Sequence, residues 1–264
     1  MTIGLDFWRS VEPVDLFRLV TDEENRRHVV KVMKTLTYDP VYTKLILEQV
    51  ESKRLETRCF VSWLAQGLQP KTYLEVGVRR GFSMAMVAAR CPEVEIYGFD
   101  SWAPNYASVD NPGPKFVQSE VERMGYKNQV NFVSGNSHRT LPAFFGGKGA
   151  RLWDRLRLNW RFKQRPTHFD MIVVDGDHSL LGAYQDLVDT MRYCAIGGVI
   201  IFDDIAPDYS KLNPEVVKAE RGEDPFGWGD LLGVWCAVKE RFPNFRYFEY
   251  VQNPPGVGLA VRLL

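Results

Sequence analysis

Acidic side chains follow four apolar segments of this sequence, each at the point where the segment ends. In chain order they are Glu75, Asp100, Asp175, Asp177, Asp203 and Asp204. If the segments are parallel strands of one sheet, these acids meet at its carboxyl edge, where ligands bind. Carboxylates crowded at one edge repel each other, so we expect a positive group among them, either a cationic ligand or a divalent metal.

A glycine turn between the first two segments predicts a nucleotide-binding β-α-β unit over residues 73–100. Gly77 allows a tight turn out of the first strand, and Gly81 lets the backbone approach a ligand at the start of the helix. Asp100 follows Gly81 by 19 residues, where a carboxylate can accept hydrogen bonds from ribose hydroxyls.

The spacing of this turn argues against a dinucleotide. A dinucleotide fingerprint needs a second glycine where this chain has Arg79, and Glu75 would repel a pyrophosphate. The same acid suits a ligand with an ammonium group and a cationic centre. The pattern acid-x-Gly-x-x-x-Gly, followed by a strand-end acid, resembles motif I of the class I S-adenosylmethionine-dependent methyltransferases. NAD binding remains the alternative.

The later acids resemble those of the cation-dependent O-methyltransferases, including the catechol, caffeoyl-CoA and macrocin-type sugar enzymes. The resemblance covers about residues 70–264 and implies Mg²⁺ as the metal. It implies that Asp175 in VVDGDH, with Asp203 and Asp204 in GGVIIFDDI, are the metal ligands. The chain departs from the catechol type at His178, where those enzymes carry a lysine near the reacting hydroxyl.

Methyl transfer to a hydroxyl also needs a base. His178 or Asp175 would take the proton, and a histidine has an ordinary pKa suited to this role. Each assignment has a structural alternative. Asp203 and Asp204 could cap a helix or line a solvated loop, Asp177 could be a turn residue, and His178 could cap the next helix.

The remaining cofactor contacts lie near the glycine turn and in the segment SGNSHRTLP. Asn136 and Ser137 are the expected adenine contacts there. The full set predicted to bind the cofactor is Glu75, Gly77, Gly81, Ser83, Asp100, Ser101, Asn136, Ser137, Asp175 and Asp177.

The elements that must position these residues form an α/β fold. Continuous apolar runs at 171–174 and 199–202 are typical of central parallel strands. Apolar residues between them recur at helical spacing, and Gly197-Gly198 is expected to end that helix. Two strands at 246–251 and 258–263, joined by a short link, predict an antiparallel hairpin. We therefore expect a Rossmann-like doubly wound sheet, mostly parallel with a C-terminal antiparallel hairpin, plus an N-terminal helical extension.

The expected domains are a helical extension at 1–69 and a methyltransferase domain at 70–264. The second contains a substrate loop at 205–230 and a basic insert at 146–166. Trp153, Leu156 and Trp160 have helical spacing in the insert. It is either a solvated edge helix pinned by its tryptophans or a docking surface for an anionic substrate or partner.

Composition bounds the function only broadly. The chain has 264 residues, with 33 Lys and Arg against 33 Asp and Glu, so its net charge gives no reason to expect nucleic acid or acidic membranes. Its four cysteines lack zinc or redox spacing, and no apolar run approaches membrane-spanning length. We expect a cytoplasmic enzyme with a small-molecule partner, no nucleic-acid or membrane partner, and self-association left open.

These observations favour Mg²⁺-dependent O-methylation of a small hydroxylated molecule, such as a natural-product sugar or a phenol. A metal-independent N- or O-methyltransferase is one alternative. A catalytically silent, cofactor-binding methyltransferase-like protein is another.

Overall fold

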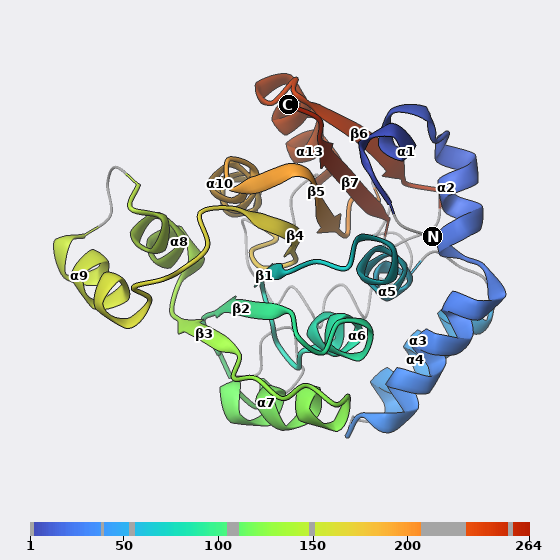
Figure 1. The fold of residues 1–264 in the computed structure, drawn as a ribbon, viewed down its shortest axis with the longest axis horizontal. Coiled ribbons are helices and arrows are strands. Elements are labelled where there is room, and N and C mark those ends of the chain that lie inside the picture. Colours follow the sequence, from blue (N-terminus) through green and yellow to red (C-terminus); the bar gives the residue numbers. More distant parts are fainter. Residues whose placement is uncertain are drawn as a thin grey trace.

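The computed structural model describes residues 3–37, 40–52, 56–104, 111–147, 151–206, 231–252 and 256–264. They contain a seven-stranded sheet with helices on both faces (Figure 1). The strand order is β3-β2-β1-β4-β5-β7-β6. The strands are β1 (Thr72–Val76), β2 (Glu95–Asp100), β3 (Asn131–Ser134), β4 (Phe169–Val174), β5 (Cys194–Asp203), β6 (Phe245–Tyr250) and β7 (Val257–Arg262).

The first five strands of the chain are parallel, and β7 runs antiparallel to both β5 and β6. The predicted mostly parallel sheet with a C-terminal antiparallel hairpin is therefore confirmed. Because β1, β4 and β5 are neighbours, the loops that follow them open at the same edge.

Each face of the sheet supports its own apolar cluster. Met171 and Val173 of β4 join the cluster on one face, and Ile172 and Val174 join the other. The first face is covered by α5 (Thr57–Leu68), α6 (Phe82–Arg90) and α7 (Pro114–Arg123). The second is covered by α8 (Ser137–Phe145), α10 (Leu180–Met191) and α13 (Leu231–Arg241). A strand buried on both faces has little freedom to shift, so the loop after it is held in a fixed position.

The N-terminal helices share the core of the sheet. They are α1 (Leu5–Ser10), α2 (Pro13–Val20), α3 (Glu23–Thr35) and α4 (Pro40–Glu51), and they lie together along the side of the molecule that α5 and β6 border (Figure 1). Trp8 and Leu16 are fully buried in the same cluster as Phe60 of α5. Arg246 of β6 donates hydrogen bonds of 2.6 Å to the carbonyl oxygens of Trp8 and Val11. The ends of the described chain are thus tied together.

Strand β5 starts earlier than the sequence predicts. The expected helix end at Gly197-Gly198 is wrong, because α10 ends at Met191 and both glycines lie inside β5. Gly197 has a φ of 78°, and the pairing of β5 with β4 shifts between Phe169 and Met171. These glycines therefore mark an irregularity within the strand. Of the predicted substrate loop at 205–230, only residues 205 and 206 lie within the described residues.

Candidate active site

Strained backbone marks the carboxyl edge of the sheet. Among the described residues, four non-glycine residues have positive φ. Three of them, Arg79 (53°), Trp102 (55°) and Asp204 (61°), follow β1, β2 and β5. Such residues occupy a sparsely populated region and are retained where the surroundings hold them. Their position at one edge points to that edge as the functional one.

Gly77 brings the turn after β1 against the loop after β4. Its φ is 83°, and a Cβ placed on it would lie 2.0 Å from the carbonyl oxygen of Asp175 and 2.7 Å from Cα of Gly176. Only glycine fits this contact. The turn predicted to bind the cofactor therefore lies in direct contact with the loop predicted to hold the metal.

Asp100 holds the same turn from the other side. Its Oδ2 accepts hydrogen bonds from the backbone N–H groups of Val78 and Arg79 at 2.8 and 2.7 Å. Its Oδ1 accepts from the N–H of Trp102 at 2.6 Å and from Asn111 Nδ2 at 3.3 Å. A ribose bound at Asp100 would therefore share a carboxylate that already positions the turn.

Glu75 is buried beneath this turn, with 3% of its surface exposed. It accepts a hydrogen bond from the hydroxyl of Tyr73 at 3.0 Å. Burial raises the pKa of Glu75 well above its usual value, and the nearby charge of Asp175 raises it further. A cationic ligand beside Glu75 would offset both effects, which is consistent with its predicted role.

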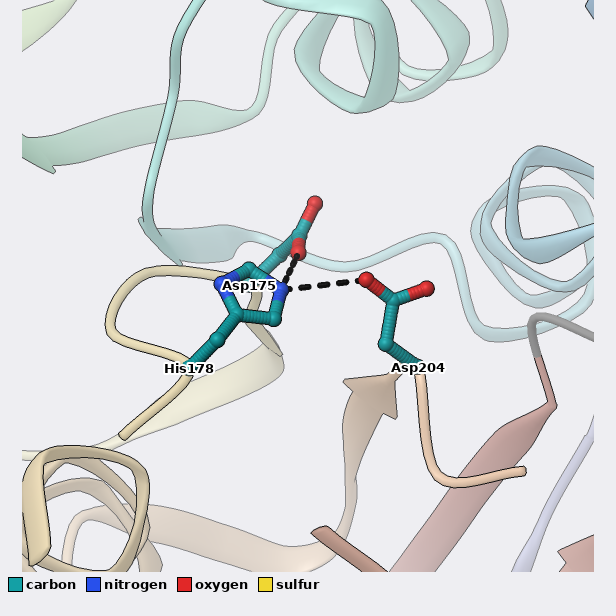
Figure 2. Close-up of side chains that lie close together, drawn as sticks. All are labelled: Asp175, His178 and Asp204. Atoms are coloured by element: carbon teal, nitrogen blue, oxygen red, sulfur yellow. Dashed lines mark hydrogen bonds and ion pairs between the residues drawn. The ribbon is translucent and has the colours of Figure 1, made fainter. Parts of the chain in front are cut away.

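Asp175, His178 and Asp204 come together at the ends of β4 and β5 (Figure 2). His178 Nε2 lies 3.0 Å from Asp204 Oδ2 and 3.5 Å from Asp175 Oδ1. The three ligand atoms all lie within 4.8 Å of one another. The side chains of His178 and Asp204 are 10% and 12% exposed, whereas that of Asp175 is 30% exposed. Asp175 is therefore the member most open to a ligand.

The electrostatics of this cluster favour a positive charge at its centre. Burial alone would lower the pKa of His178, but its hydrogen bonds to Asp175 and Asp204 outweigh burial and raise the pKa well above the usual value. Burial in turn raises the pKa of Asp204, and the hydrogen bond to His178 opposes that rise. An imidazolium between the two carboxylates satisfies all three groups.

Asp203 faces a different neighbour. Its Oδ1 accepts hydrogen bonds from Thr57 Oγ1 of α5 and from the N–H of Asp204, the latter at 2.9 Å. Burial raises the pKa of Asp203 well above its usual value, and the charges of Asp204 and Asp175 add to the rise. Asp203 is outside the group of three close ligand atoms. Its role as a metal ligand stays a prediction.

The other predicted residues lie in the loops and helix starts that follow the parallel strands. Asp177 Oδ1 accepts from the N–H of Ser179, as a turn residue does, and Asn136 caps α8 by accepting from the N–H of His138, both at 2.8 Å. Ser83 is buried in the first turn of α6, and Ser101 is exposed just after β2. Ser137 begins α8. Their contacts with a cofactor stay predictions.

Sequence reasoning missed Asp186 of α10, a fully buried acid beneath the loop after β4. His138 Nε2 lies 3.5 Å from both Asp186 Oδ1 and Asp177 Oδ2. Burial raises the pKa of Asp186 to about 7, and His138 opposes this rise. One signal was available, because Asp186 lies four residues before Thr190 and three after Ala183, on the buried face of the helix.

Comparison with known proteins agrees with this fold. A family described as a methyltransferase domain matches residues 74–205, half of the chain. None of the curated protein sequences is significantly similar to it.

Three solved structures share the fold. An O-methyltransferase family protein from Burkholderia thailandensis is 12% identical with a TM-score of 0.54, over 83% of this chain and 57% of that one. A methyltransferase from Podospora anserina with SAH bound is 15% identical with a TM-score of 0.51, over 89% and 87%. The O-methyltransferase TomG from Streptomyces achromogenes, involved in tomaymycin synthesis and solved with SAM, is 15% identical with a TM-score of 0.51, over 86% and 91%. The chain belongs to the methyltransferase-domain family, with the fold of the class I S-adenosylmethionine-dependent methyltransferases.

Proposed function

We propose that this protein transfers a methyl group from S-adenosylmethionine to a hydroxyl oxygen of a small molecule, with a divalent cation bound at Asp175 and Asp204. The observation that carries this proposal is the Asp175, His178 and Asp204 cluster, which lies against the Gly77 turn. S-adenosylmethionine would supply the methyl group from its sulfonium. Two structural neighbours, from Burkholderia thailandensis and Streptomyces achromogenes, support the oxygen acceptor by their descriptions as O-methyltransferases.

The donor atoms fit a divalent cation. Asp175 and Asp204 offer carboxylate oxygens, which Mg²⁺ prefers. The position of His178 Nε2, 3.0 Å from Asp204 and 3.5 Å from Asp175, supports the fit, because the same two carboxylates that raise its pKa would favour another positive charge there. A bound cation would lower the pKa of the acceptor hydroxyl and orient its oxygen. We place Mg²⁺ first, with Asp203 as the third ligand if its side chain leaves Thr57.

The residues of the chain would then divide the work. Glu75 and Asp100 would bind the cationic and ribose parts of the cofactor, at a turn that Gly77 keeps narrow. His178 would accept the hydroxyl proton at Nε2 only after its own pKa falls. That fall requires another cation to bind the carboxylates of Asp175 and Asp204. Holding two reactants in line can lower the reaction barrier by about 7–11 kcal/mol. We therefore expect the positioning of cofactor and acceptor to supply most of the rate acceleration.

A metal-independent methyltransferase is the second candidate. One observation favours it, because His178 already contacts both carboxylates and, when protonated, offsets part of their charge without any metal. The acceptor would then lose its proton to water, because His178, held protonated by the two carboxylates, has no free lone pair.

The test is a methyl-transfer assay with labelled S-adenosylmethionine and a panel of phenols, catechols and sugar hydroxyls. Turnover that EDTA removes and Mg²⁺ or Mn²⁺ restores supports the first candidate. Turnover that survives EDTA supports the second. Binding of S-adenosylhomocysteine without transfer to any acceptor class would contradict both and leave a cofactor-binding protein.

A cytoplasmic location is also proposed, because all four cysteines are free and three of them are buried. Among the described helices, none is long and apolar enough to cross a membrane.

A further inference from the structure

Helix α9 (Leu152–Arg161) exposes an apolar stripe. The exposed fractions are 65% for Leu152, 79% for Trp153, 49% for Leu156 and 77% for Trp160. Two tryptophans with most of their surface in solvent are unusual in a soluble domain. The hypothesis that the tryptophans pin this helix to the domain is therefore wrong.

The helix is held to the domain by its opposite side. Leu158 and the following Phe162 are buried at 2% and 7% exposure and join the cluster beneath α8. At about 100° per residue, the four exposed apolar positions cover an arc of about 100°, and Leu158 points away from the middle of that arc. In Figure 1, α9 is the outermost element at one end of the long axis, with α8 between it and the sheet. The apolar stripe thus faces outward.

The surroundings of the stripe are strongly basic. Residues 151–165 contain six cations and one acid, although the whole chain is neutral. The cations are Arg151, Arg155, Arg157, Arg161, Lys163 and Arg165. The one acid, Asp154, is already paired with Arg139 of α8 at 3.0 Å. The expectation of no membrane partner was based on the net charge, which conceals this local excess.

We propose that α9 is a docking helix that lies in the plane of an anionic lipid surface. Its Trp and Leu side chains would enter the boundary between headgroups and acyl chains, where the amphipathic indole ring is favoured. Arg157 and Arg161 would contact anionic headgroups beside them, each basic residue adding to the attraction. This peripheral attachment is independent of the methyl-transfer proposal and does not require a membrane-spanning segment.

Charge selects this occupant over a second copy of the chain. A twofold contact through α9 would place its arginines against the arginines of the other copy, with no acid of the stripe left to separate them. An anionic lipid surface satisfies the cations and the apolar stripe together. An acidic amphipathic peptide could also cover the cations and the apolar stripe, but over a smaller area. A failure to bind anionic vesicles would point to such a peptide and not to lipid.

The test measures binding of the full-length protein to vesicles. We expect cosedimentation with equal parts phosphatidylcholine and phosphatidylglycerol, little with phosphatidylcholine alone, and weakening as salt is raised. The variants Trp153→Ser/Trp160→Ser and Arg157→Glu/Arg161→Glu should each lower the partition coefficient by about tenfold or more. Because all four side chains are exposed, these variants should keep the wild-type circular dichroism spectrum.

Controls change an exposed apolar residue and two exposed arginines elsewhere on the surface. Val14→Ser removes an exposed apolar side chain from α2, and Arg18→Glu/Arg27→Glu reverses two exposed cations on α2 and α3. Both should bind vesicles as the wild type does. Equal loss in the controls, equal binding to both vesicle types, or no binding at low salt would overturn the proposal. So would a dimer in light scattering that the tryptophan variant abolishes.

Discussion

Thr57 Oγ1, in the first turn of α5, donates a hydrogen bond to Asp203 Oδ1 at the end of β5, across 146 residues of sequence. The same oxygen of Asp203 accepts from the N–H of Asp204. The N-terminal helices therefore reach the site, because α5 fixes the residue that precedes the strained Asp204. A helix N-terminus beside a buried carboxylate also stabilises its charge.

Thr57→Val removes the donor but keeps the shape of the side chain. We expect the free energy of unfolding to fall by about 1–3 kcal/mol, because the buried oxygen of Asp203 loses a hydrogen-bond partner. Urea denaturation measures this change. Thr57→Ser keeps the hydroxyl, so its free energy of unfolding should fall markedly less. Equal decreases in both variants would show that packing, and not the hydrogen bond, matters at Thr57.

Asp204→Ala should abolish cation-dependent turnover while leaving cofactor affinity nearly unchanged. Asp204 lies in the three-residue cluster, whereas the cofactor is expected at Glu75, Gly77 and Asp100. Isothermal titration with S-adenosylhomocysteine, and separately with Mg²⁺ or Mn²⁺, checks the division. A parallel loss of both affinities would argue that the cluster serves the cofactor and not a metal.

Gly77→Ala should destabilise the protein and prevent cofactor binding. The added methyl group would overlap the carbonyl of Asp175, and a positive φ adds about 1–2 kcal/mol of strain. Gly125→Ala is a matched control, since Gly125 has a φ of 90° and, its chain neighbours aside, no atom of the described residues lies within 4 Å of the added Cβ. S-adenosylhomocysteine should raise the melting temperature of the Gly125→Ala control as it does that of the wild type. The same rise in Gly77→Ala would contradict the close contact between Gly77 and Asp175.

Asp186→Asn tests the buried acid through the pH dependence of stability. The pKa of Asp186 is raised from 3.8 to about 7 on folding, so the folded state binds a proton there more tightly than the unfolded state. The resulting contribution to the free energy of unfolding is fully present below pH 3.8 and is lost as the pH rises through about 7. The asparagine variant should therefore gain stability relative to the wild type between pH 5 and pH 8, by about 4 kcal/mol at most. Denaturation midpoints at each pH measure the gain.

A matched change, Asp6→Asn on the exposed surface of α1, controls for the loss of one formal charge. A stability difference for Asp186→Asn that stays constant across this range would show that His138 already compensates the buried acid. Asp177 also faces this group, so the measurement is best repeated in Asp177→Asn.

The sheet could be predicted from sequence because its signals are local. The predicted strands at 171–174 and 246–251 match β4 and β6 to within two residues, since apolar runs and turn residues lie next to each other in the chain. The start of β5 could not be predicted in this way. Gly197 resembles a helix stop, and only the pairing with β4 shows that it is an irregularity in a strand.

The site was predictable in part for the same reason. Asp175 and Asp204 follow apolar runs, so their convergence follows from a parallel sheet. The direction in which Asp203 points depends on Thr57, and no pattern within β5 reveals a partner 146 residues away. The burial of Asp186 likewise depends on how α10 lies under the loop after β4.

Pairing between β5 and β7 has a consequence for biosynthesis. Asp203 is paired with Val257, and β7 is translated after every other strand of the sheet. On the ribosome, β5 therefore has an open edge until β7 emerges, and the aspartates at its end have no fixed backbone to support them. We therefore expect the candidate active site to form late in synthesis, and intermediates lacking β7 to be prone to aggregation through the open edge of β5.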